Sequence, residues 1–125
     1  MQESGAMQES SGRPRTPLPG RPVRGSATGR PIMAAMDLLG RRWALRIIWE
    51  LRDGPLGARA LLERCDRMSS SVLYQRLDEL TGARLLTRDG AGAYMLTETG
   101  AALGPPLGAL DSWAKRWSAA LAATE

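Results

Sequence analysis

Apolar residues recur every three or four positions through most of the chain from residue 31 onward, and glycine, proline or short polar turns separate the runs. This spacing predicts helices over residues 31–39, 41–52, about 57–65 and about 69–81. Pro31 suits the first turn of the first helix, where backbone N–H groups have no helical partner anyway. In the fourth predicted helix, Leu73, Leu77 and Leu80 form the inward stripe. Ser69 precedes that helix and can cap it.

The periodicity changes after Gly82, which we expect to stop the fourth helix. Residues 85–88 and 94–97 are short strand candidates, and Asp89-Gly90-Ala91-Gly92 between them has hairpin turn chemistry. A last helix is expected over about 98–123, broken or kinked at Pro105-Pro106 because proline lacks an N–H donor. Helix, helix, short helix, tight turn, helix, hairpin and helix is the order of a winged helix-turn-helix. We therefore expect a mostly α fold with a small β-hairpin wing (α+β).

The first thirty residues differ from the rest of the chain. They contain almost no large apolar side chains and hold four of the eight prolines, so we expect residues 1–30 to be a disordered arm and residues 31–125 to be the folded domain. Five arginines and two glutamates give the arm +3 of the chain's net charge of +4. A basic arm on a nearly neutral domain fits a nucleic-acid partner, although a solubilising tail explains the charge equally well.

Several classes of protein are excluded by what the sequence lacks. There is no histidine, no paired-carboxylate or nucleophile motif and no phosphate-binding glycine loop, so we expect neither an enzyme nor a bound cofactor or metal. The single cysteine, Cys65, favours a reducing compartment, and we interpret it as a small core residue, with redox sensing as the alternative. No apolar run approaches the ~20 residues of a membrane span, and the start lacks a signal peptide. We therefore expect a cytoplasmic protein.

Three spaced motifs carry a family resemblance. Residues 36–43, Met-Asp-Leu-Leu-Gly-Arg-Arg-Trp, resemble the "ALDLIGGKW" opening of HxlR-type regulators, which are relatives of the MarR class. Residues 69–80, with Gln75-Arg76-Leu77 at their centre, resemble the family's "S-x-x-x-L-x-Q-R-L-x-E-L" recognition helix. Residues 96–100, Leu-Thr-Glu-Thr-Gly, are similar to its "LT-x-x-G" step from wing to last helix. The resemblance implies a homodimeric, DNA-binding transcription regulator, usually autoregulated.

The chain also departs from the family pattern. Arg30 stands where the family usually has a cysteine, so a thiol switch of that kind is unsupported. The wing tip is reduced to residues 89–92, and Ser71 and Tyr74 replace a frequent lysine and threonine. These changes weaken the expected grip on DNA, and the arginine-rich arm is our hypothesis for what compensates.

With its leucines inward, the fourth helix turns polar side chains toward solvent, and an α-helix fits the major groove of DNA. Gln75 can pair with adenine, and Arg76 has two open roles: a contact to phosphate or guanine, or a salt bridge to Asp78 or Glu79. The arginines outside this helix are phosphate candidates, each with the alternative of a solvated surface charge. The candidate DNA contacts are Ser69, Ser70, Ser71, Tyr74, Gln75, Arg76, Arg67, Arg59 and Arg88.

The last helix is apolar on more than one side, because Trp113 lies off the stripe through Ala114 and Leu121. We expect it to pack against the partner's first helix in a homodimer. The predicted dimer interface comprises Met33, Met36, Leu107, Leu110, Trp113, Trp117 and Leu121. A small, planar hydrophobic effector could stack between tryptophans near that interface, although core packing explains them as well. The candidate pocket residues are Trp43, Trp49, Trp113 and Trp117.

One rival function stays open: a winged helix that binds protein without binding DNA. The near-neutral domain, Ser71 and the short wing favour it. Gln75-Arg76, the serine-rich helix start and the basic arm favour DNA. The operator, the identity of any effector, and repression as against activation do not follow from the sequence.

Overall fold

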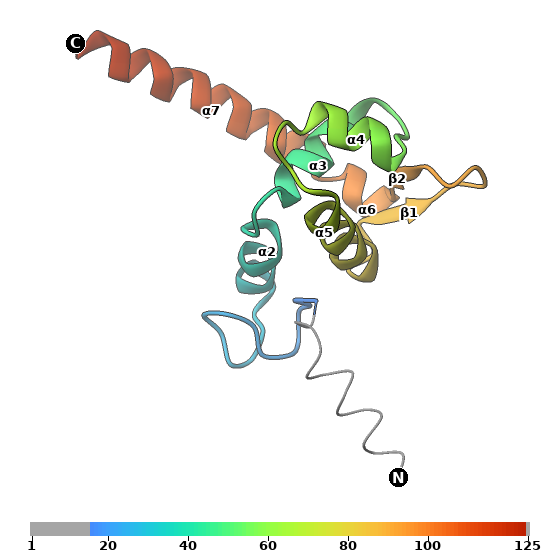
Figure 1. Cartoon of the computed structure of the whole chain (residues 1–125). Coiled ribbons are helices and arrows are strands. Elements are labelled where there is room, and N and C mark those ends of the chain that lie inside the picture. Colours follow the sequence, from blue (N-terminus) through green and yellow to red (C-terminus); the bar gives the residue numbers. More distant parts are fainter. Residues whose placement is uncertain (1–15, 125) are drawn as a thin grey trace.

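A computed structural model describes residues 16–124, and residues 1–15 and 125 lie outside the described part. The described chain is mostly helical, with one two-stranded hairpin, and it has the arrangement of a winged helix-turn-helix (Figure 1). Its elements in order are α2 (Pro31–Leu39), α3 (Ala44–Glu50), the 3-10 turn η1 (Leu51–Asp53), α4 (Ala58–Arg64), α5 (Ser70–Gly82), β1 (Leu86–Arg88), β2 (Tyr94–Leu96), α6 (Glu98–Ala101) and α7 (Gly104–Ala123). The predicted fold class is therefore confirmed.

Two helix ends differ from the prediction. α3 begins at Ala44 and not at residue 41, because Trp43 adopts a left-handed conformation with φ 77° and the residues before it form a turn. Gly82, the expected stop of α5, is the last residue of the helix and does not adopt a left-handed conformation. Arg84, two residues later, adopts that conformation, with φ 64°. Both ends depend on how the next element packs, which local spacing does not report.

The turn between α4 and α5 is tight. Arg67 adopts a left-handed backbone conformation there, with φ 72°, which is uncommon for a residue with a Cβ atom. Ser69 then caps α5 as predicted, since its Oγ accepts a hydrogen bond of 3.2 Å from the backbone N–H of Val72. The pair α4–α5 is the helix-turn-helix.

The wing is a short antiparallel hairpin. Leu86 pairs with Leu96 and Arg88 with Tyr94, and Leu56 adds an isolated bridge to Tyr94 on the other side of β2. The carboxylate of Asp89 closes the tip, because its Oδ1 accepts hydrogen bonds from two backbone N–H groups of the turn, at 2.9 Å each. The predicted turn residues 89–92 thus form a compact loop.

The step from wing to α6 explains the Leu-Thr-Glu-Thr-Gly motif. Thr97 Oγ1 donates to the carbonyl of Arg84 (2.7 Å) and accepts from the N–H of Gly100 (3.0 Å), so it ties the hairpin to the start of the helix. Gly100 is buried, and a Cβ atom there would collide with the carbonyl oxygen of Leu85. Glycine is needed at this position because two backbones approach closely.

One hydrophobic core joins α3, α4, α5 and the hairpin. The predicted inward stripe Leu73, Leu77 and Leu80 is fully buried, and Cys65 is buried among core residues as a small apolar side chain. The largest fully buried side chains are Ile47, Ile48, Leu51, Leu61, Leu73, Leu77, Leu80, Leu86 and Cys65.

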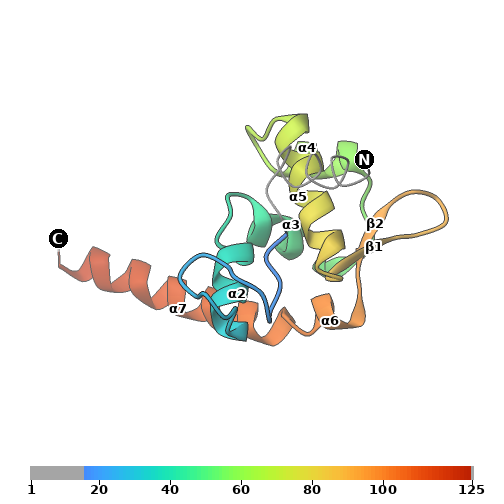
Figure 2. The ribbon, with the colours of Figure 1, turned by 90° about the horizontal axis from the view of Figure 1, so that it is seen from below.

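Helix α7 extends far from this core (Figures 1 and 2). The predicted break occurs before Pro105-Pro106, and both prolines lie in the first turn of α7, where a missing N–H costs nothing. Leu107 packs into the core of its own chain, so its predicted place in the dimer interface is wrong: it is the one buried residue of α7 and anchors the helix to the core. No helix of the described part is long and apolar enough to cross a membrane.

Residues 16–30 are folded back beside α2 (Figure 2). Val23 and Ser26 exchange backbone hydrogen bonds of 3.0 and 3.1 Å, and the N–H of Arg24 donates to Asp37 Oδ2 at 3.2 Å. Pro17 is buried and lines an apolar hollow of about 290 Å³ together with residues of α2. This part of the predicted arm therefore has defined contacts where disorder was expected, because local turns and a few apolar residues hold it. The rest of the arm lies outside the described residues.

Candidate nucleic-acid interface

Helix α5 has one buried face and one polar, exposed face. The buried leucines hold the helix against α4 and the hairpin, and the side chains on the opposite side project into solvent. Tyr74 is half exposed, with 50% of its surface accessible, which is unusual for an aromatic residue in a small domain. We name the exposed set the reading face: Ser69, Ser70, Ser71, Tyr74 and Gln75.

The start of α5 suits an anionic partner. Its first turn carries no acidic residue, and the hydroxyls of Ser69 and Ser71 lie 3.3 Å apart at the helix terminus. Unpaired N–H groups and the helix dipole make such a terminus electropositive. The acidic residues of the helix, Asp78 and Glu79, lie near its other end. The first half of α5 is therefore the half that can approach phosphates.

Two predicted arginines lie on the segments that precede α5. Arg67 lies in the turn before α5 and Arg59 on α4, and both are exposed. Neither forms an ion pair with another residue among positions 16–124. Arg64, in contrast, lies 3.6 Å from Glu50. Arg59 and Arg67 are thus exposed cations of the helix-turn-helix that have no acidic partner in the described part of the chain.

Arg88 is held on the wing. Its guanidinium lies 4.8 Å from the ring centroid of Tyr94, and its Nη2 donates to the carbonyl of Gly92 at 3.2 Å. The side chain nevertheless stays exposed. The hairpin therefore presents one positioned cation at the end of β1, beside the turn.

Arg76 does not point away from the protein with the reading face. Its Nε donates to the carbonyl oxygen of Arg42 at 2.7 Å, and its Nη1 lies 3.3 Å from Glu79 Oε1. Only 15% of the side chain is exposed. The structure thus has the ion pair with Glu79 that the sequence left open, and Arg76 does not join the proposed DNA contacts.

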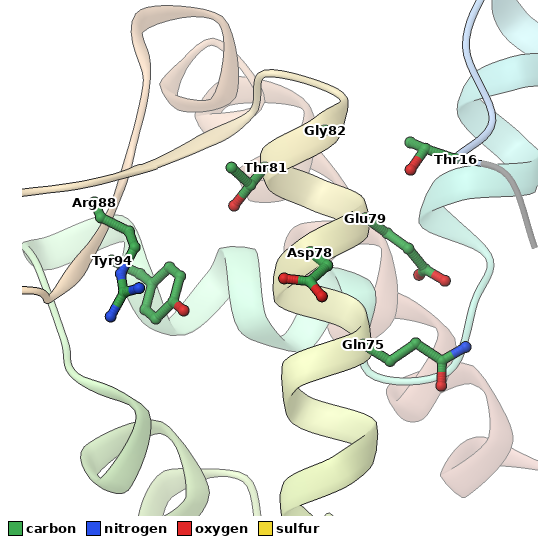
Figure 3. A pocket seen from close by; sticks show the side chains of 8 residues that line it. All are labelled: Thr16, Gln75, Asp78, Glu79, Thr81, Gly82, Arg88 and Tyr94. Carbon is green, nitrogen blue, oxygen red and sulfur yellow. The ribbon is translucent and has the colours of Figure 1, made fainter. Parts of the chain in front are cut away.

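A hollow of about 490 Å³ lies beside the reading face (Figure 3). Gln75, Asp78 and Thr81 approach it from α5, Arg88 and Tyr94 from the hairpin, and Thr16 from the opposite side. Sequence reasoning missed Thr16 and Thr81. Glu79, which also lines the hollow, had two signals in the sequence: its spacing of three residues from Arg76 and its place at the E of the recognition-helix motif.

The remaining predicted interface residues lie on two exposed apolar surfaces. Met36 is 59% exposed on α2, whereas Met33 is half-buried. Trp113 and Trp117 stack on each other on α7, with ring centroids 5.3 Å apart and planes inclined by 18°. The exposed apolar residues of α7 are Leu110, Trp113, Trp117 and Leu121.

Within one chain the four tryptophans lie in different surroundings. Trp49 lines a hollow of about 250 Å³ between α3 and α7, and the guanidinium of Arg52 covers its ring at 3.4 Å. Trp43 lines a separate hollow at the start of α3. Trp113 and Trp117 stand exposed on α7. Trp43 and Trp49 therefore line two different hollows, and Trp113 and Trp117 line neither of them.

The thiol of Cys65 is fully buried. Burial raises its pKa above the ordinary value, with nearby Arg46 acting in the opposite direction and Glu50 adding to the rise. A buried thiol of raised pKa is a poor nucleophile. The structure therefore favours the core role for Cys65 over the redox role.

Comparison with known sequences gives a consistent family. Residues 38–121 match the profile of the HxlR-like helix-turn-helix family. The chain is 33% identical over 89 residues to YvaP of Bacillus subtilis (strain 168), an uncharacterized HTH-type transcriptional regulator, and the match covers 66% of this chain and 82% of YvaP. It is 32% identical over 90 residues to the HTH-type transcriptional regulator YodB of the same organism, covering 67% of this chain and 80% of YodB.

Solved structures agree with these relatives. The crystal structure of quinone-bound YodB superposes with a TM-score of 0.64 and 34% identity, covering 68% of this chain and 94% of that one. A MarR-family regulator from Enterococcus faecalis V583 superposes with a TM-score of 0.65 over 82% of this chain and 98% of the other, at 24% identity, which shows a shared fold.

Proposed function

The chain belongs to the HxlR-like helix-turn-helix family of transcription regulators, which are not enzymes, and from this premise we propose that it is a homodimeric regulator that recognises a specific double-stranded DNA sequence. The reading face would enter the major groove, with Gln75 and Tyr74 toward base edges and the serines toward phosphates. Arg59, Arg67 and Arg88 would bind phosphates on either side.

The observation that carries this proposal is the division of α5 into two faces. Leu73, Leu77 and Leu80 anchor it rigidly in the core, while five neighbouring polar residues project from the start of the helix with no other part of the described chain covering them. A helix rigidly held and polar at its exposed N-terminal half is the geometry by which helix-turn-helix proteins reach base edges.

Dimerisation is the second part of the proposal. The exposed apolar residues of α7 and Met36 of α2 would cover one another across a two-fold axis, because an isologous interface pairs the same surfaces of both chains. Two reading faces would then lie about 34–36 Å apart on an inverted repeat.

A planar hydrophobic effector is the third part. YodB has been crystallised with quinone bound, and in the present chain Trp49 lines a mostly apolar hollow at the base of α7. Titration of 1,4-naphthoquinone against tryptophan fluorescence tests this idea. Saturable quenching that Trp49→Leu abolishes supports it, and quenching that stays linear in both chains removes it.

The test of DNA binding uses the duplex upstream of the chain's own gene. We expect a gel shift that weakens as salt rises, because phosphate contacts release counterions. A scrambled duplex of the same length should compete poorly for the protein. Equal binding of both duplexes would remove sequence specificity. An absence of any shift at low salt would favour the rival function, a winged helix that binds protein.

A further inference from the structure

Glu79 is a carboxylate that the proposed DNA contacts do not use. It is the one charged residue that is buried within positions 16–124, with 6% of its surface exposed. It lies on α5 one turn beyond Gln75 of the reading face, and its side chain turns toward the side of the helix where Thr16 lies (Figure 3). Burial of a charge is costly unless partners compensate it.

Two arginines from different parts of the chain compensate Glu79. Arg41, in the turn between α2 and α3, places Nη1 2.9 Å from Glu79 Oε2. Arg76, one turn earlier on α5, places Nη1 3.3 Å from Glu79 Oε1. Each arginine also has a second partner: Arg41 Nη2 lies 3.7 Å from Asp37 Oδ1 on α2, and Arg76 Nε donates to the carbonyl of Arg42. We call Asp37, Arg41, Arg76 and Glu79 the Glu79 network.

The Glu79 network joins α5 to the last turn of α2 and to the approach to α3. Its two cations and two anions balance, so the group can stay largely buried without an excess charge. Buried ion pairs add little to stability compared with apolar packing, and in some proteins they instead fix one arrangement of the parts they connect. The connected parts here are the helix with the reading face and the helix with exposed Met36.

We propose that Glu79 is a positioning residue for DNA recognition: through Arg41 and Arg76 it holds α5 at one fixed orientation relative to α2. Because α2 takes part in the proposed dimer interface, this orientation sets how both reading faces meet the two half-sites. The inference rests on the proposed function. It assigns a role to a residue that does not touch DNA.

Charge and positioning predict opposite effects for Glu79→Gln. Removing a negative charge near a DNA-binding face strengthens binding to any duplex if charge alone matters. If Glu79 positions α5, the neutral amide no longer holds both guanidinium groups, α5 loses its fixed angle, and binding to the specific sequence weakens. The sign of the change therefore separates the two explanations.

The experiment first selects a preferred duplex from a random-sequence pool with the unmodified full chain. The quantities measured are the dissociation constants for the selected and for a scrambled duplex, and the ratio of the scrambled to the selected value, by fluorescence anisotropy at one salt concentration. Glu79→Gln is expected to lower this ratio about tenfold or more, comparable to a mismatched base pair. Thermal unfolding, recorded on the same samples, keeps all comparisons at a temperature where each variant is folded.

Glu50→Gln is the matched control. Glu50 pairs with Arg46 (2.8 Å) and Arg64 (3.6 Å), so the substitution removes the same charge from a similar ion-pair cluster that joins α3 to α4 and not α2 to α5. Its ratio is expected to stay unchanged. An equal fall in both variants would show a general loss of stability and overturn the proposal.

Arg41→Lys keeps the inference testable if Glu79→Gln does not fold. Lysine keeps the charge but lacks the planar fork that joins Asp37 to Glu79, so we expect the ratio to fall in the same direction. An unchanged ratio in a folded Glu79→Gln or Arg41→Lys variant overturns the positioning role alone. If the unmodified chain selects no duplex, the proposed function fails first and this inference fails with it.

Discussion

The head of the molecule (residues 44–100) and helix α7 differ in how much of their apolar surface the chain itself covers. In the head, α3, α4, α5 and the hairpin bury or half-bury their large aliphatic side chains against one another and leave none of them exposed. In α7, a helix of 20 residues, Leu107 alone is buried, and two stacked tryptophans stand in solvent. Figure 1 shows the same difference in shape, with a compact head and a helix that leaves it.

This difference separates the part of the molecule that buries its apolar surface within one chain from the part that we expect to bury it against a second chain. The head, with Leu38 of α2 and Leu107 of α7, completes one core within a single chain and presents the reading face there. A long helix with an exposed apolar stripe gains little within its own chain, and such a surface commonly marks an interface. We therefore expect substitutions in the head to act on folding and substitutions along α7 to act on association.

The largest effect is expected for Leu77→Ala. Leu77 is fully buried, so truncation leaves a cavity and lowers the free energy of unfolding by about 2–5 kcal/mol. Urea unfolding should show this loss at every protein concentration. Leu121→Ala on exposed α7 is the matched leucine variant, and its effect should depend on protein concentration because it acts through the dimer. If both variants lost the same stability at every protein concentration, this would contradict the proposed difference between the head and α7.

Trp117→Ala comes next. Loss of one stacked, exposed tryptophan is expected to weaken the dimer by about 2 kcal/mol or more, as for a central interface residue. Sedimentation velocity across a dilution series measures the shift to monomer. Lys115→Ala is the control, because Lys115 is 77% exposed on the same helix and pairs only with Asp111 among the described residues. A monomeric unmodified chain at high concentration would refute the dimer.

Alanine substitutions at two glycines are expected to change stability by smaller amounts, and in opposite directions. In the head, Gly100→Ala forces a Cβ atom against the carbonyl of Leu85 and should cost about 1–3 kcal/mol of stability. In α7, Gly108 has open space around it, so Gly108→Ala should raise helix stability by about 0.5–1 kcal/mol. Chemical denaturation measures both. A neutral Gly100→Ala would mean that the two backbones do not approach so closely.

The smallest effect is expected at Cys65. Burial raises its thiol pKa, so the thiol stays protonated in the folded chain at a pH where it begins to ionise in the unfolded chain. Iodoacetamide at pH 8 should therefore label the unfolded chain quickly and the folded chain very slowly. Because the pKa is higher in the folded chain than in the unfolded chain, the free energy of unfolding falls as the pH rises past the ordinary thiol pKa. Rapid labelling of the folded chain would restore the redox interpretation.

Much of the fold could be predicted from spacing, because each helix needs its own apolar stripe and each turn its own residue types. The leucine stripe of α5, the cap at Ser69 and the hairpin turn are local features, and the structure has all three. The order of the predicted helices and strands, together with the family motifs, then indicated the winged helix. Helix ends were less predictable, since Trp43 and Arg84 adopt left-handed conformations that the neighbouring elements impose.

The candidate site was predictable only in part. The exposed serines, Tyr74 and Gln75 follow from the helical phase of the leucines. The direction of a long side chain does not follow from phase: Arg76 turns back toward Arg42 and Glu79. Leu107 shares the spacing of the exposed residues of α7, yet it alone meets the core, because the helix leaves the head just after it.

The order of amino acids alone therefore determined which segments become helices and strands and which side of α5 is polar, because these depend on periodicities of a few residues. The tertiary structure decided which charges meet across the fold and which apolar residues stay uncovered. Arg41 and Glu79 are 38 positions apart, and their side chains meet only when the fold brings the turn after α2 beside α5. Contacts of that kind depend on the path of the whole chain, which no local pattern encodes.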